Sequence, residues 1–175
     1  MSEDGAPGFL VRAERDDDHA AVHAVNAAAF ESPVEAELVD KLRREADSVV
    51  SLVAEAGGKI VGHIMFTPVT LPGHPDLRIM GLAPMAVAAA HRGQGVGSAL
   101  VRNGLDRCAR MEMGAVVVLG HPGYYPRFGF KPGAGYGLAC EYDAPADSFM
   151  VKELQPRYLA GRSGTVSYHA AFAGE

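Results

Sequence analysis

Residues 85–100, with the sequence MAVAAAHRGQGVGSAL, give the strongest signal in this chain. They read as the end of a strand, a glycine-rich turn and the start of a helix. Gly93, Gly95 and Gly97 let the backbone adopt positive φ angles and approach a ligand closely. Free N–H groups of the turn and of the first helical turn then converge at the positive end of the helix dipole. This arrangement predicts an anion site, to which Arg92 adds a cation suited to a phosphate.

The sequence does not match two familiar nucleotide-binding motifs, and each mismatch falls at a particular position. A P-loop needs Gly-Lys-Ser or Gly-Lys-Thr after its glycines, whereas this chain has GSA at positions 97–99. A dinucleotide-binding turn needs a third glycine where Ser98 stands, and an acidic residue at the end of the next strand. That strand ends at Leu119 and is followed by Gly120 and His121, with no carboxylate. The anion site therefore belongs to another class.

Strands and helices alternate in a mixed order around this turn. Gly57 and Gly58 join two strands as a hairpin, and Asp16–Asp18 cap the first helix. The expected strands are residues 9–14, 48–56, 59–71, 77–88, 115–119, 149–154 and 165–172. The first expected helix follows Asp16–Asp18 and runs to about Phe30. The others are residues 33–46 (with Leu38, Leu42 and Ala46 on one face), 96–113 and a short one at 122–128. Early hairpins followed by a strand–helix–strand unit predict an α+β fold with a mixed sheet.

Pro84 lies inside the apolar strand expected at residues 77–88. A proline removes a ladder hydrogen bond, so it marks an edge strand or a bulge. The run is too apolar for an exposed edge, which favours a bulge in a buried strand. Such a bulge would leave backbone groups free near the end of the strand.

A second motif supports a family resemblance. The pattern Arg92-x-x-Gly95-x-Gly97, between a strand and a helix, resembles the acetyl-CoA pyrophosphate motif of the GNAT N-acetyltransferase superfamily. The segment HPGYYPRFGF at residues 121–130 resembles that superfamily's next motif, a tyrosine followed by a short helix and Gly-Phe. The resemblance is strongest to the YhbS-type branch. It covers residues 9–172, with 48–130 the best part.

The resemblance implies a fold and a set of cofactor contacts. The fold would be a twisted mixed sheet, flanked by helices, whose strands 4 and 5 splay apart to admit the pantetheine arm of acetyl-CoA. Met85, Ala86 and Val87 would pair with that arm, and residues 92–98 would hold the pyrophosphate. The implied cofactor-binding residues are Met85, Ala86, Val87, Arg92, Gly93, Gln94, Gly95, Val96, Gly97, Ser98, Tyr125 and Phe128.

The resemblance also implies the chemistry, in which an amine attacks the thioester directly. Tyr125 would protonate the leaving thiolate, with Tyr124 as the alternative; core packing is an equally good explanation of Tyr125. A backbone N–H near Met85 or Ala86 would bond the carbonyl oxygen.

The general base stays open. No carboxylate lies on residues 82–87, so the candidates are Glu37, Glu55, His63, whose side chain would face the acceptor cleft, and water. A structural strand residue is the more frequent role of a histidine such as His63, and a solvated helix face is the more frequent place of a glutamate such as Glu37.

We therefore expect an N-acetyltransferase that uses acetyl-CoA and an unidentified amine. Two alternatives stay open: a non-catalytic acyl-CoA-binding regulatory domain, and transfer of a different acyl group. The regions expected to choose the acceptor are residues 22–44 and 133–159. They show no charge pattern that translates into a substrate.

Composition limits the remaining possibilities. The 175 residues fit one domain over residues 1–175, with residues 1–8 expected to be disordered. A formal net charge of −5 argues against a nucleic-acid partner, and no apolar run is long enough for a membrane span. Two separated cysteines favour a cytoplasmic location. His19 and His23 lack the glutamate of a His-Glu-x-x-His site, so we expect no metal. A homodimer is one possible assembly.

Overall fold

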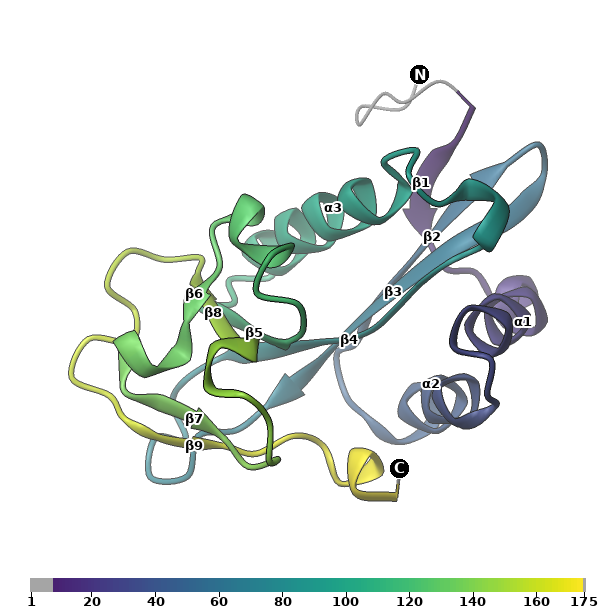
Figure 1. The fold of residues 1–175 in the computed structure, drawn as a ribbon. Coiled ribbons are helices and arrows are strands. Elements are labelled where there is room, and N and C mark those ends of the chain that lie inside the picture. The colour runs from purple at the N-terminus through teal and green to yellow at the C-terminus, as the bar shows by residue number, and fades with distance from the viewer. Residues whose placement is uncertain (1–7, 175) are drawn as a thin grey trace.

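The computed structural model describes residues 8–174. The disorder expected for residues 1–8 falls, apart from Gly8, outside the described residues. A seven-stranded sheet in the order β1-β2-β3-β4-β5-β8-β6 forms the centre, and β7 and β9 form a second, two-stranded sheet (Figure 1). The strands are β1 (Leu10–Ala13), β2 (Val50–Ala56), β3 (Lys59–Val69), β4 (Ile79–Val87), β5 (Ala115–Leu119), β6 (Lys131–Pro132), β7 (Leu138–Cys140), β8 (Phe149–Glu153) and β9 (Gly164–Val166).

Three α-helices cover the two faces of the central sheet. They are α1 (His19–Phe30), α2 (Val34–Glu45) and α3 (Val96–Arg110). Helix α3 packs on one face, and the pair α1 and α2 packs on the other (Figure 1). Short 3-10 turns connect the elements at Asp16–Asp18, Ala89–His91, Tyr125–Phe128, Gly133–Tyr136, Ala146–Ser148 and Ala170–Gly174. Within the described part of the chain, no helix is both long and apolar enough to cross a bilayer.

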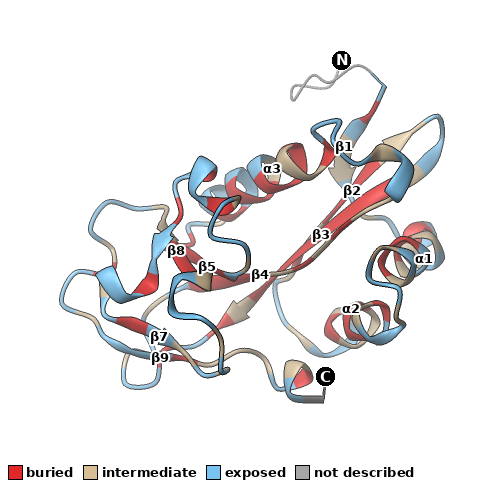
Figure 2. Ribbon diagram, viewed as in Figure 1, coloured by how far each residue is buried: buried red, intermediate tan, exposed pale blue. Residues whose placement is uncertain are grey.

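Two clusters of buried residues lie between the central sheet and its helices, and a third joins the central sheet to β7 and β9 (Figure 2). Val101, Leu105 and Cys108 form the buried stripe of α3, as their spacing predicts. Strand β5 is apolar because both its faces are covered, and its four residues before Leu119 are all buried. The mixed α+β fold predicted from the sequence is confirmed, with β4 and β5 as the parallel pair in the centre.

Strand β4 contains the bulge predicted at Pro84. Ile64 of β3 pairs with Met85, whereas Phe66 pairs with Leu82, so the β4 side carries one extra residue. Pairing between β4 and β5 ends at Leu82 and Val118. Beyond that point, no residue of β5 is registered against the second half of β4. The two central strands therefore splay apart, as expected.

Several expected elements differ in the structure. The prediction of one strand over residues 165–172 is wrong. Strand β9 ends at Val166, Ser167 forms an isolated bridge with Thr70 just after β3, and a 3-10 turn starts at Ala170. The short helix at 122–128 is a 3-10 turn over Tyr125–Phe128 only. Helix α2 ends before Ala46, whose backbone is extended.

Candidate functional site

The turn before α3 leaves backbone donors pointing outward. Gly93 and Gly95 have φ angles of 77° and 86°, a left-handed conformation that favours glycine. Gly95 is the N-cap of α3 and provides no side chain to cap it. The first helical N–H groups, from Val96 onward, therefore have no partner within the helix. The first turn of α3 also contains no acidic residue, so its positive end is available to an anion.

These donors line a cavity of about 540 Å³, which we call the cradle cavity. It brings together nine residues implied by the resemblance: Met85, Ala86, Val87, Arg92, Gly93, Gly95, Val96, Gly97 and Ser98. It also contains Tyr124, the alternative general acid, and four residues that were not candidates from the sequence: Ala29, Phe30, His91 and Arg127. The cavity thus joins the free edge of β4 to the start of α3.

The charge of the cradle cavity is positive. Arg92 is exposed and donates to the carbonyls of Val87 and Ala29, each at 3.4 Å. Arg127 lies 4.5 Å above the Tyr124 ring and donates to the Tyr124 carbonyl at 2.8 Å. No carboxylate is among the described residues that line the cavity. Two guanidinium groups beside a helix N-terminus suit a diphosphate.

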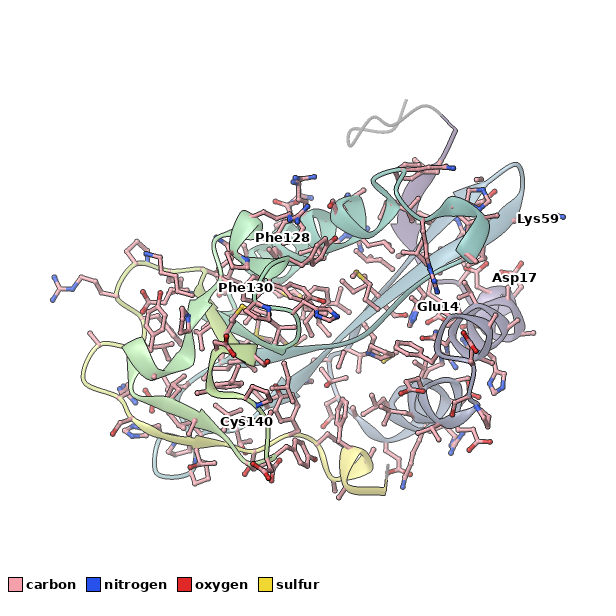
Figure 3. The ribbon with its side chains drawn as sticks, viewed as in Figure 1. Glu14, Asp17, Lys59, Phe128, Phe130 and Cys140 are labelled. Carbon is pink, nitrogen blue, oxygen red and sulfur yellow. The ribbon has the colours of Figure 1, made fainter. Side chains whose placement is uncertain are left out.

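Gln94 and Phe128 lie outside the cradle cavity. The Gln94 amide donates to the Ala90 carbonyl at 3.3 Å on the exposed side of the turn. Phe128 is buried with its ring edge-on to Tyr124, at a centroid distance of 5.3 Å, and Arg102 lies 5.3 Å from its ring. Figure 3 shows Phe128 close to α3 and above Phe130. Phe128 therefore packs against the Tyr124 ring without lining either cavity.

A second cavity of about 510 Å³ lies beside the first, and we call it the aromatic cavity. Phe30 and Met85 line both cavities, so the two are adjacent at the β4 bulge. The aromatic cavity is lined by Phe30, Glu35, Leu38, Leu82, Ala83, Pro84, Met85, Val118, Leu119, Gly120, His121, Tyr125, Tyr142, Tyr168 and Phe172. Residues from α2, the two splayed strands and the carboxyl-terminal segment meet there.

Tyr124 and Tyr125 point into different cavities. The Tyr124 hydroxyl lies 3.2 Å from Ser98 Oγ, at the start of α3. Tyr125 lines the aromatic cavity, is 8% exposed and packs so closely over Gly120 that a Cβ there would meet its ring at 2.5 Å. Burial raises the pKa of the Tyr125 phenol to about 12. Tyr125 therefore keeps its proton at neutral pH.

The structure places His63 away from both cavities. Its side chain is 0% exposed, with Nδ1 3.1 Å from the Asn26 amide nitrogen and Nε2 2.9 Å from Ser51 Oγ. Ser51 donates to Glu14 at 2.7 Å, so it accepts a hydrogen bond from the protonated Nε2 of a neutral ring. Burial lowers the His63 pKa to about 3. His63 is therefore a buried structural residue of β3, the more frequent of the two roles considered, and its side chain does not face either cavity.

Two further candidate bases also lie outside the cavities. Glu37 is exposed, and Glu55 on β2 accepts a hydrogen bond from Arg12 Nε of β1 at 2.9 Å. Glu35, two residues before Glu37, is the carboxylate that lines the aromatic cavity. The sequence contained a usable signal: Leu38 is buried on α2, and a residue three positions before it shares its face.

His23 of α1 lies outside both cavities, at the contact between α1 and α2. His23 Nδ1 is 2.8 Å from an Asp40 carboxylate oxygen on α2, which ties the two helices together. Among residues 8–174, no group of three histidine, cysteine or acidic side chains is arranged to hold a metal ion. Cys108 is buried and Cys140 is half-buried, and both are free thiols.

The splayed mixed sheet and the glycine cradle define a class of proteins. Residues 11–133 match the acetyltransferase (GNAT) domain. The chain belongs to the GNAT acetyltransferase family.

Three comparisons give the similarity in sequence and structure between this chain and its relatives. The chain is 38% identical over 165 residues to YhbS of Escherichia coli K12, an uncharacterized N-acetyltransferase, covering 94% of this chain and 98% of the relative. The crystal structure of E. coli YhbS in complex with CoA superposes with a TM-score of 0.90 at 37% identity, covering 99% of this chain and 96% of that one. A GNAT family acetyltransferase from Brucella melitensis in complex with acetyl-CoA gives a TM-score of 0.77 at 36% identity, covering 94% of this chain and 97% of that one.

Proposed function

We propose that this protein transfers an acetyl group from acetyl-CoA to an amine. The observation that carries the proposal is the cradle cavity, in which unsatisfied N–H groups of α3 and two arginines face one space. Met85, Ala86 and Val87 on the free edge of β4 would bind the pantetheine arm. Residues 92–98, except the outward-facing Gln94 side chain, would hold the pyrophosphate, with Arg127 as a further cation. The bound CoA of YhbS and the bound acetyl-CoA of the B. melitensis protein support this assignment.

The thioester would lie where the two cavities meet, beside Met85. An amine in the aromatic cavity would attack the thioester carbon, forming the C–N bond. The C–S bond then breaks, the sulfur takes a proton, and the amine nitrogen loses one. A backbone N–H near Met85 or Ala86 would stabilise the carbonyl oxygen as its negative charge develops.

Tyr125 is the proposed general acid. It lines the cavity that adjoins Met85, and its raised pKa keeps the phenol protonated until the thiolate leaves. The Tyr124 hydroxyl forms a hydrogen bond with Ser98 at the proposed pyrophosphate end of the cavity. This position suits a role in cofactor binding better than proton transfer to the thiolate.

Two measurements test the proposal. Calorimetric titration with CoA should show binding, and release of free thiol from acetyl-CoA should depend on an added amine. Replacing Tyr125 with phenylalanine should lower turnover by about 100-fold and leave CoA affinity unchanged. Absence of CoA binding would overturn the proposal. Binding with no turnover in a broad amine screen would favour a regulatory acyl-CoA-binding domain, and a preference for longer acyl-CoAs would favour another acyl group.

A further inference from the structure

Two polar atoms in the aromatic cavity have no partner. Glu35 Oε1 and Tyr168 Oη are buried and form no hydrogen bond with the described residues. Buried polar atoms are hydrogen-bonded in the great majority of cases. Both residues line the same cavity, although α2 carries one and the carboxyl-terminal segment the other. Their meeting in one cavity indicates a place for a polar group of a ligand.

Glu35 brings a negative charge that no protein cation neutralises. Among residues 8–174, the ion pairs do not include it. It lies in the first turn of α2, where the helix dipole favours a carboxylate. The positive end of the helix dipole therefore lies beside this carboxylate. The charge remains available to a cationic ligand.

The rest of the aromatic cavity has little to offer a second charge. Its walls are mainly aliphatic and aromatic, and the Tyr168 ring packs against Tyr142 at 5.7 Å and Phe172 at 5.5 Å. The described lining contains no lysine, no arginine and no carboxylate besides Glu35, and its one imidazole is that of His121. An acceptor with its own carboxylate would have to bury it without a lysine or arginine partner, which is costly. A polyamine would place its additional ammonium groups against apolar walls.

We infer that the acceptor is a small primary monoamine with an apolar, ring-bearing body, whose ammonium group binds Glu35. The inference rests on the proposed acetyl transfer and names the substrate class of that reaction. Tyr168 Oη accepts a second hydrogen bond from the ammonium group, and the body packs on the aromatic walls. Before attack, the Glu35 carboxylate takes one proton from the ammonium group and passes it to water, which leaves a neutral amine. The nitrogen loses its second proton as the C–N bond forms, and this proton balances the one that Tyr125 gives to the leaving thiolate.

A matched panel of acceptors tests the class. The probes are 2-phenylethylamine, phenylalanine (which adds a carboxylate), spermidine (which adds cations) and Nα-acetyl-lysine amide. Thiol release from acetyl-CoA is followed for each. We expect kcat/KM for 2-phenylethylamine to exceed that of every other probe by about 10-fold or more. Equal or better use of any other probe overturns the inference.

A matched pair of variants tests Glu35. Glu35→Gln keeps the shape and removes the charge, whereas Glu37→Gln makes the same change on the exposed side of α2. Glu35→Gln should lower kcat/KM for 2-phenylethylamine by roughly 10- to 100-fold, and Glu37→Gln should not change it. Binding of the uncharged 2-phenylethanol, measured by calorimetry with CoA present, should be the same in both variants. Loss of 2-phenylethanol binding in Glu35→Gln would indicate a purely structural role and contradict the inference.

The same experiments separate this inference from the proposed function. If CoA does not bind, both the proposed function and this inference are overturned. If CoA binds but 2-phenylethylamine is not acetylated, or is used equally well by Glu35→Gln, the inference alone fails.

Discussion

Replacing Gly97 with alanine should separate the stability of the fold from its capacity to bind CoA. Gly97 is in the first turn of α3 and faces the cradle cavity. A Cβ there would lie 3.2 Å from the Tyr124 hydroxyl and 3.6 Å from Met85 Cε. The first contact is tight, so the tyrosine must move by a few tenths of an ångström.

The effects on stability nearly cancel. Alanine is favoured over glycine in a helix by about 1 kcal/mol. Movement of Tyr124 weakens its hydrogen bond to Ser98, a loss of about 1 kcal/mol. The free energy of unfolding should therefore stay within about 1 kcal/mol of the wild type.

The effect on binding should be large, because the methyl group occupies space beside the N–H donors. Loss of one hydrogen bond to a charged group costs about 1.5–3 kcal/mol, which is roughly 10- to 100-fold in Kd. Calorimetric titration with CoA measures the Kd, and urea unfolding measures stability. Gly135→Ala is the control, since that glycine lines neither cavity and a Cβ there meets nothing within 4 Å. Unchanged CoA affinity in Gly97→Ala would refute the assignment of the cradle.

Three other changes test the site and the core. Because the pKa of Tyr125 is raised to about 12, kcat should not decline between about pH 8 and about pH 10; a tyrosine-dependent decline with a midpoint near pH 10, absent in Tyr125→Phe, would contradict this. His63 stays neutral in the folded protein down to about pH 3, whereas the unfolded chain takes up its proton below about pH 6.5, so stability is lost as pH falls through that window. Between about pH 7 and about pH 5 the wild type should lose about 2 kcal/mol more than His63→Gln in urea unfolding, and equal losses would show that the ring is protonated. Gly104→Ala would place a Cβ 2.1 Å from the Phe66 ring, so overpacking should outweigh helix propensity and lower stability by about 1–2 kcal/mol; an unchanged urea midpoint would argue against this contact.

The sequence predicted the parts of the fold that depend on local patterns. The glycines before α3, the apolar run of β5 and the proline in β4 each report a backbone conformation or a degree of burial at their own positions. The bulge at Pro84 was predicted because a proline cannot donate to a ladder, whatever strand lies beside it. The register shift between β3 and β4 confirms that argument.

The parts that were missed depend on contacts between distant segments. Glu35 faces the aromatic cavity because the rotation of α2 is set by packing on the sheet, and Phe172 completes the cavity from the other end of the chain. The sequence left the role of His63 open because its burial requires Asn26 and Ser51, which reach it from α1 and β2. The strand expected at 165–172 ended early because Ser167 pairs outside its own sheet. Local patterns carry no information on such pairings.

The two cavities share only Phe30 and Met85 among their described lining residues, and this fixes how the ligands can arrive. Under the proposed transfer, acetyl-CoA would enter beside α3, and the amine would enter between α2 and the carboxyl-terminal segment. Neither molecule has to leave before the other can approach. Steady-state kinetics should accordingly show the sequential pattern of a ternary complex. The product CoA would be able to leave while the next amine is bound.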